Sequence, residues 1–233
     1  NIGRNKNVIK VVESAGEAEV PIRIGINSGS IDKKLLEKYG HPTAEAMVES
    51  ALEHIDILEK ENFYDIIISM KATDVWMTIK AHKLLAKKVK YPFHIGITEA
   101  GTSWAGSIKS AVGIGSLLTQ GFGDTIRVSL TGDPVKEVRT AWQILKSLNL
   151  RKKGPQIISC PTCGRTRINL VKLVEDVEKA LTEITKPITV AVMGCEVNGP
   201  GEAKEADIGI AGGKNQGFIF KKGQLIQKVR EEK

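Results

Sequence analysis

The 233-residue sequence is poor in cysteine, poor in aromatic residues and without any long apolar run. Three cysteines are too few for a disulfide scaffold of this length, and an odd number cannot all pair within one chain. No stretch reaches the roughly 18 apolar residues that a membrane-spanning helix needs. Aromatic residues at 5% argue against a surface that stacks on RNA bases. Initiator Met and signal peptide are both absent. These absences predict a globular cytoplasmic protein that binds neither membranes nor nucleic acid.

The net charge of +7 is unevenly distributed along the chain. Residues 151–233 hold 15 basic and 10 acidic side chains, which is five of the seven net positive charges, together with all three cysteines and none of the four histidines. A solvated Lys-rich surface is the simplest interpretation. The alternative is a docking face for an acidic partner, either a nucleic acid or an acidic protein.

Short β-rich runs alternate with longer helix-patterned segments over the first 150 residues. The runs are rich in Ile and Val, as strands buried on both faces of a parallel sheet are. We predict strands at 20–27, 65–71, 93–99 and 125–131, with helices near 43–61, 74–88, 106–119 and 134–147. These four βα units fit half of an eight-stranded barrel or a small doubly wound sheet. Polar or ionisable residues end each predicted strand, and this favours the TIM-type barrel, whose active sites lie at the carboxyl ends of the strands. The first five residues resemble a loop after a strand, so the chain is expected to begin within a fold.

A second domain is predicted after the polar breaker at 151–155. A strand at 156–159 precedes a helix with an apolar seam from Leu170 to Ile184, and a strand at 188–193 and three short strands follow. The predicted fold class is therefore α/β: about four units of a partial (β/α)8 barrel over 1–150, then a small α/β domain over 151–233.

Ionisable and polar side chains near the ends of the first four strands form a candidate site. Because residues i and i+2 of a strand share a face, these pairs are expected to point together: Arg23 and Asn27, Ser69 and Lys71, Ile97 and Glu99, Arg127 and Ser129. Three cations against one carboxylate predict an anionic ligand, such as a phosphate or diphosphate. Buried Arg–Glu pairing in a barrel core is the alternative. Glycines at 113, 115, 121 and 123 are weaker evidence for phosphate binding.

The cysteines leave three kinds of chemistry open. Cys160 and Cys163 form a CxxC motif, and Cys195 follows 32 residues later. One zinc knuckle fits, but a zinc ribbon needs a second pair. A redox thiol pair leaves Cys195 without a role. An iron–sulfur cluster needs four ligands where the chain offers three thiols. Cys195 is otherwise a small buried apolar residue. A tight turn at 199–201 could bring Glu202 back toward Cys195, although an exposed turn carboxylate is the commoner outcome.

These motifs together resemble one enzyme family. The segments PIRIGINSGS, ISMKA, GITEAG, IRVSLTGDP, CPTCGR and VMGCEVNGPGEA occur in the order found in the 4-hydroxy-3-methylbut-2-enyl diphosphate synthases, enzymes of the methylerythritol phosphate route to isoprenoids. The resemblance covers essentially the whole chain, and GCEVNGPGE is its most specific part. It implies the C-terminal portion of the enzyme, because about four further βα units would complete the barrel.

The resemblance also implies the reaction and the residues that perform it. The reaction is the reductive dehydration and ring opening of 2-C-methyl-D-erythritol 2,4-cyclodiphosphate, with electrons from ferredoxin or flavodoxin. A 4Fe-4S cluster is implied on three cysteines and a carboxylate, with the substrate bound by barrel residues and by an Asn near the cluster. The implied cluster ligands are Cys160, Cys163, Cys195 and Glu202, and the implied substrate-binding residues are Arg23, Asn27, Lys71, Arg127, Ser129 and Asn198.

Two carboxylates have implied catalytic roles: Glu99 as an acid–base group, and Glu202 as the cluster ligand that gives way to substrate. A homodimer is implied for the full-length enzyme, and the activity of a portion on its own is doubtful. From other classes, a nucleic-acid-binding module with a zinc ribbon and a CxxC thiol–disulfide oxidoreductase remain as alternatives.

Overall fold

The computed structural model describes residues 5–197, 201 and 204–230, and the side chains from residue 7 onward. The chain divides into two compact units, residues 1–150 (unit 1) and 151–233 (unit 2). No helix within the described residues is long and apolar enough to cross a membrane.

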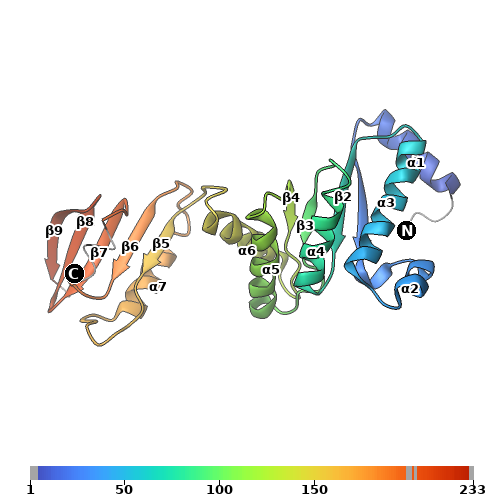
Figure 1. Cartoon of the computed structure of the whole chain (residues 1–233). Coiled ribbons are helices and arrows are strands. Elements are labelled where there is room, and N and C mark those ends of the chain that lie inside the picture. Colours follow the sequence, from blue (N-terminus) through green and yellow to red (C-terminus); the bar gives the residue numbers. More distant parts are fainter. Residues whose placement is uncertain (1–4, 198–200, 202–203, 231–233) are drawn as a thin grey trace. The chain divides into compact units, whose positions relative to one another are not determined.

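Unit 1 alternates strands and helices along the chain (Figure 1). Its elements are α1 (Asn5–Glu17), β1 (Ile22–Asn27), η1 (Ser28–Ser30), α2 (Lys33–Tyr39), α3 (Ala44–Lys60), β2 (Ile66–Lys71), α4 (Val75–Leu85), β3 (His94–Gly96), α5 (Ser103–Leu118), β4 (Thr125–Arg127) and α6 (Pro134–Ser147). Side chains of Thr43, Asp74 and Asp133 accept hydrogen bonds from backbone amides in the first turns of α3, α4 and α6. These caps satisfy amides that have no partner within a helix, and so define where each helix begins.

The four strands of unit 1 run parallel and follow one another in chain order. β1 pairs with β2, with Asn27 opposite Lys71, and β3 pairs with β4, with Gly96 opposite Arg127. A parallel bridge between Ile68 and Phe93 joins the two pairs. All strands therefore present their carboxyl ends at the same edge.

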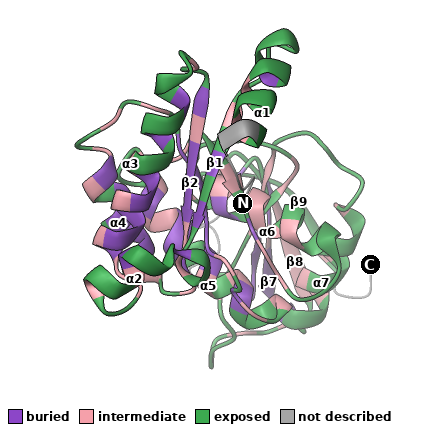
Figure 2. Ribbon diagram, turned by 90° about the vertical axis from the view of Figure 1, so that its right-hand side faces the viewer, coloured by how far each residue is buried: buried purple, intermediate pink, exposed green. Residues whose placement is uncertain are grey.

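Helices α3, α4, α5 and α6 pack against this sheet, and the core of unit 1 lies between them and the strands. Figure 2 shows buried residues in β1 and β2 and on the neighbouring parts of α3 and α4. In β1, Ile24 and Ile26 are buried, whereas Arg23 and Asn27 are exposed. One face of the strand therefore belongs to the core, and the other carries its polar side chains.

Unit 2 is built on a five-stranded mixed sheet in the order β5-β6-β7-β8-β9. Its elements are β5 (Gln156–Ser159), α7 (Leu170–Ala180), β6 (Thr189–Met193), β7 (Ile208–Gly213), β8 (Gln216–Lys221) and β9 (Gln224–Arg230). The first three strands are parallel, and the last three form an antiparallel meander. Helix α7 packs on β6 through its apolar seam.

The elements differ from the predicted ones mainly at strand ends. β3 stops at Gly96 rather than at residue 99, and β4 stops at Arg127 rather than at 131. Glu99 has a positive φ of 51°, which is incompatible with an extended strand. Helix α2 was not predicted. Two of the four glycines taken as weak phosphate signals serve packing: a Cβ on Gly113 would lie 2.5 Å from Cδ1 of Ile97, and one on Gly123 would lie 2.5 Å from Cδ1 of Ile95, whereas a Cβ on Gly115 or Gly121 would meet nothing within 4 Å.

Candidate functional site

Three cations gather on the polar face of the unit 1 sheet. Arg23 lies on β1, Lys71 at the end of β2 and Arg127 at the end of β4. Burial, followed by the charges of Arg23 and Arg127, lowers the pKa of Lys71 from its usual value. The two arginines are exposed and Lys71 is half-buried. Mutual repulsion makes this cluster, named here the cationic face, a site that an anion would stabilise.

No acidic side chain neutralises the cationic face among the residues that the structure describes. The ion pairs among the described residues join Lys38 to Glu49, Lys60 to Asp56 and Lys80 to Glu45, and none of them includes Arg23, Lys71 or Arg127. The alternative of Arg–Glu pairing within a barrel core therefore gains no support.

Gly96 fixes how closely the strands of the cationic face approach one another. A Cβ at this position would lie 2.5 Å from the backbone oxygen of Arg127 and 3.5 Å from Cδ of Lys71. Only glycine permits this approach. By contrast, a Cβ on Gly25, which lies on the same face of the sheet, would meet nothing within 4 Å.

His94 belongs to the cationic face, although sequence reasoning missed it. Its pKa falls to about 4, because of burial first and then the charges of Arg23, Lys71 and Arg127. His94 Nδ1 lies 2.8 Å from Oγ1 of Thr125, while its buried Nε2 has no hydrogen-bond partner in the structure. The alternation of His94 with Gly96 on β3 was the available signal, since residues two apart share a face.

The remaining predicted unit 1 residues lie near the carboxyl edge of the sheet. The Asn27 side chain is exposed and does not cap η1, and Ser129 is half-buried beyond β4. Glu99 is exposed, and its Oε2 accepts a hydrogen bond from Oγ1 of Thr73 at 3.3 Å. The expectation that Ile97 and Glu99 share a strand face is wrong. The strand ends at Gly96, Ile97 is fully buried toward α5, and Glu99 turns to the surface.

The cysteine-bearing loops of unit 2 lie at the carboxyl ends of two neighbouring parallel strands. Cys160 follows β5, Cys195 lies two residues after β6, and Ser159 is opposite Val192 in the ladder. The amide of Gly194 donates a hydrogen bond to Sγ of Cys160 at 3.2 Å. None of the three cysteines forms a disulfide: Cys195 is buried, Cys160 half-buried and Cys163 exposed.

The described residues include three of the four predicted cluster ligands, Cys160, Cys163 and Cys195. No three His, Cys, Asp or Glu side chains in the described part of the chain lie close enough to hold a metal ion. Glu202 and Asn198 lie outside the described residues. The structure brings the loop that begins at Cys160 next to the loop of Cys195. A second hydrogen bond joins them, because the Arg167 amide donates to the Gly194 carbonyl at 2.9 Å.

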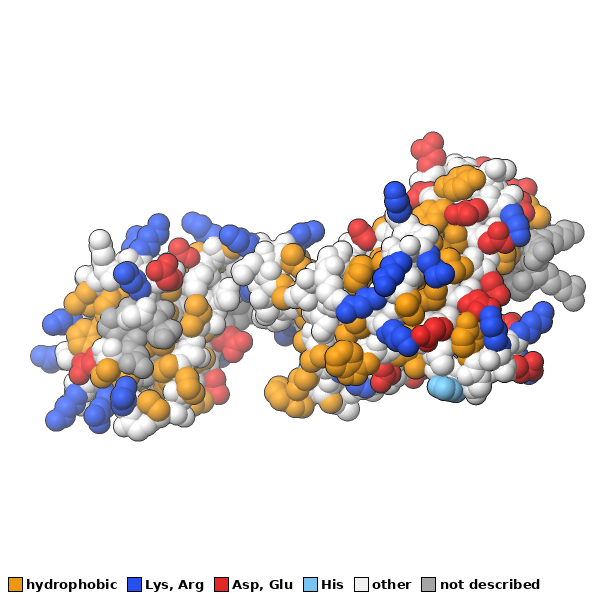
Figure 3. All heavy atoms as spheres, in the orientation of Figure 1, with side chains coloured by type: hydrophobic (Ala, Val, Ile, Leu, Met, Phe, Trp, Pro, Cys, Tyr) orange, Lys and Arg blue, Asp and Glu red, His pale blue; other side chains and the backbone are white. Residues whose placement is uncertain are grey.

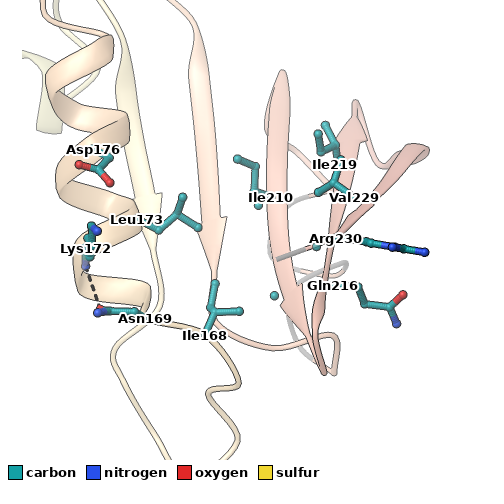
Figure 4. A pocket seen from close by; sticks show the side chains of 12 residues that line it. Ile168, Asn169, Lys172, Leu173, Asp176, Ile210, Gln216, Ile219, Val229 and Arg230 are labelled. Atoms are coloured by element: carbon teal, nitrogen blue, oxygen red, sulfur yellow. Dashed lines mark hydrogen bonds between the residues drawn. The ribbon is translucent and has the colours of Figure 1, made fainter. Parts of the chain in front are cut away.

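A separate cavity of about 420 Å³ lies in unit 2 between α7 and the β7–β9 meander (Figure 4). Ile210, Ile219 and Val229 line its apolar part, and Lys172 and Arg230 are among its polar residues. None of the predicted site residues lines it.

Parallel strands joined by helices, with a cationic face that has Lys71 and Arg127 at strand carboxyl ends and Arg23 near the start of β1, define an α/β protein built from βα units. The comparisons with known proteins name its family. Residues 1–142 match the GcpE TIM-barrel domain, and residues 156–233 match the GcpE protein C-terminal domain. The chain belongs to the GcpE family.

Several curated relatives share one name, 4-hydroxy-3-methylbut-2-en-1-yl diphosphate synthase (flavodoxin). The protein of Caldanaerobacter subterraneus subsp. tengcongensis is 62% identical over 100% of this chain, and that of Geobacter sulfurreducens is 61% identical over 99%. The Clostridium perfringens protein is 58% identical over 100% of the chain. The chain spans 65% of the length of the first two relatives and 66% of the third. Neither the zinc-ribbon nor the thiol–disulfide alternative is supported, because both units match GcpE domains.

Proposed function

We propose that the chain carries the diphosphate-binding and cluster-binding parts of a 4-hydroxy-3-methylbut-2-enyl diphosphate synthase. The reaction is the reductive dehydration and ring opening of 2-C-methyl-D-erythritol 2,4-cyclodiphosphate. The observation that carries this proposal is the cationic face of Arg23, Lys71 and Arg127, which is unneutralised among the described residues. The names of the relatives support the choice of substrate.

Unit 1 would act as the C-terminal half of a TIM-type barrel and hold the diphosphate. Arginine forks match phosphate oxygens in pairs, and Lys71 adds a point charge. A bound dianion would favour the charged form of Lys71, because it replaces repulsion by attraction. Asn27 and Ser129 would supply neutral hydrogen bonds. The exposed Glu99 would move the proton that loss of water requires.

Unit 2 would act as the cluster domain. Cys160, Cys163 and Cys195 are cysteines outside any disulfide, on loops that follow the neighbouring strands β5 and β6, and three thiolates suit a 4Fe-4S cluster. Glu202 is the fourth ligand in this proposal, and Asn198 would lie near the substrate. When bound, the cluster would supply single electrons. The Gly194 amide, which donates to Cys160 Sγ, would stabilise the thiolate form of that ligand.

The electron donor in this proposal is a flavodoxin, as the names of the relatives indicate, with ferredoxin as the second choice. Figure 3 shows Lys and Arg side chains outnumbering Asp and Glu on the visible surface of unit 2. Such a surface suits an acidic electron carrier. A homodimer is proposed for the full-length enzyme.

Calorimetric titration with pyrophosphate tests the diphosphate site in this chain. Lys71→Ala or Arg127→Ala should weaken binding about 10- to 100-fold, since each removes a charged hydrogen bond worth about 1.5–3 kcal/mol. Lys87→Ala and Arg139→Ala are the matched controls, because they remove the same charges from exposed positions outside the cationic face. Absence of pyrophosphate binding, or equal losses in the controls, would refute the site.

A further inference from the structure

Among the described residues of unit 1, four buried side-chain atoms have no hydrogen-bond partner: Oγ of Ser69, Nε2 of His82, Nε2 of His94 and Oγ of Ser110. A buried polar atom without a partner costs about 1–3 kcal/mol, so each needs an explanation. His82 and Ser110 lie within the helices α4 and α5. Ser69 and His94 lie instead on strands of the cationic face, and the strand register places them side by side.

The bridge between Ile68 and Phe93 fixes that register. One residue further along each strand, Ser69 stands beside His94 on the opposite face, because successive strand residues alternate between faces. Gly25 pairs with Ser69, and Thr125 pairs with His94. The four residues Gly25, Ser69, His94 and Thr125 thus form one transverse row across β1–β4, named here the polar row.

Cations lie on both sides of the polar row along the strands. Arg23 is two residues before Gly25, whereas Lys71 is two residues after Ser69, and Arg127 two after Thr125. The polar row therefore lies between the three charges, with Oγ of Ser69 and Nε2 of His94 buried within it. Gly25 leaves this part of the row without a side chain, and a Cβ there would meet no atom within 4 Å.

We infer that Ser69 and His94 form a second, neutral binding layer of the diphosphate site. In this layer the Ser69 hydroxyl and the Nε2–H of neutral His94 donate hydrogen bonds to an oxygen of the anionic substrate. The inference rests on the proposed function, and it adds two residues to the site that the motif resemblance does not include.

In this proposal, the contact with Thr125 sets which ring nitrogen of His94 carries the proton. If its hydroxyl donates to Nδ1 across the 2.8 Å contact, Nε2 must carry the hydrogen of the neutral ring. This tautomer presents a donor to the anion, whereas the other would present a lone pair that repels it. Thr125 is therefore a positioning residue, and His94 and Ser69 are the groups that touch the ligand.

Matched pairs of variants separate this role from a structural one in the pyrophosphate titration. His94→Phe should weaken binding about 10-fold or more, and Ser69→Ala a few-fold, since hydrogen bonds to charged groups are lost. His82→Phe and Ser110→Ala remove equally buried, equally unpartnered groups away from the cationic face, and should leave affinity within twofold. Wild-type affinity in both His94→Phe and Ser69→Ala would overturn the inference and leave the proposed diphosphate site intact. Failure of the wild-type chain to bind pyrophosphate would refute both.

Nitrogen-15 NMR of the histidine side chains supplies a readout that does not depend on variant stability. The wild-type chain should show His94 as the Nε2–H tautomer, with pyrophosphate moving its Nε2 resonance and leaving that of His82 in place. Thr125→Val should shift the tautomer balance. An Nδ1–H tautomer, or an Nε2 resonance that pyrophosphate does not move, would contradict the inference.

Discussion

The two units differ in how they bury their apolar side chains. Unit 1 has one continuous core between its parallel sheet and the helices α3–α6. Unit 2 divides its buried residues into two small clusters, one of Leu170, Val190 and Val192 and one of Ala191, Met193, Ala206, Ala211 and Phe220. Cys160 packs against both clusters. Burial of apolar side chains can stabilise unit 1, whereas the smaller clusters of unit 2 leave more of its stability to the cluster proposed for its cysteines.

The largest expected effect is therefore a selective stabilisation of unit 2 by the proposed 4Fe-4S cluster. Anaerobic reconstitution with iron and sulfide should give a brown protein that dithionite bleaches. Hydrogen exchange followed by mass spectrometry should show stronger protection of β5–β9. The gain in opening free energy should be about 3–4 kcal/mol where the effective concentration of the cluster is about 100 to 1,000 times its dissociation constant. Exchange in β1, β2 and α3 should not change.

Cys195→Ser should abolish both the colour and the protection. Thr162→Ala is the matched control, because it alters the loop between Cys160 and Cys163 without removing a thiol. A colourless protein that retains stoichiometric zinc, or equal protection of both units, would contradict the proposed cluster domain.

A smaller effect is expected from adding one methyl group to the face of unit 1. Gly96→Ala forces a Cβ to within 2.5 Å of the Arg127 backbone oxygen, so it should lower the free energy of unfolding by about 1–3 kcal/mol. Gly25→Ala adds the same group where no atom lies within 4 Å, and should change it by less than about 0.5 kcal/mol. Urea unfolding followed by tryptophan fluorescence measures unit 1 alone, since Trp76, Trp104 and Trp142 all belong to it. Equal losses in both variants would show that the strand approach is not tight.

Sequence periodicity was sufficient for most of the fold. Ile- and Val-rich runs identified the strands of unit 1, because a strand buried by helices has no room for polar residues on its core face. The ends of β3 and β4 were placed too late, since most residues that follow the ladder are still apolar or β-branched: Ile97, Thr98, Val128, Leu130 and Thr131. Only tertiary contacts, such as Ile97 packing at Gly113, reveal that the chain has left the strand.

The site residues that could be predicted are those whose charge is unusual in an apolar strand. Charged Arg23, Lys71 and Arg127 stand out in apolar strands, and structure places them on one face. The alternation of His94 with Gly96 is a weak signal, because a buried histidine in a strand is equally consistent with an ordinary core position. The role of His94 depends on the bridge that aligns β2 with β3, and no local pattern encodes that register.

The smallest expected effect is a pH dependence confined to unit 1, because unit 2 has no histidine. The folded-state pKa of His94 is about 4, against about 6.5 for an unfolded histidine. Between these values the unfolded chain binds a proton that the folded chain does not, so this contribution to stability is complete above pH 6.5 and is lost as pH falls toward 4. Allowing for solvent at the exposed face, the loss at pH 5 should be about 1 kcal/mol. His94→Gln should flatten the fall in unfolding free energy from pH 7 to pH 5, measured by urea titration with tryptophan fluorescence. His54→Gln, at an exposed position on α3, should leave the slope unchanged. If His94→Gln and wild type lose stability in parallel, His94 is not the buried neutral base that the cationic face requires.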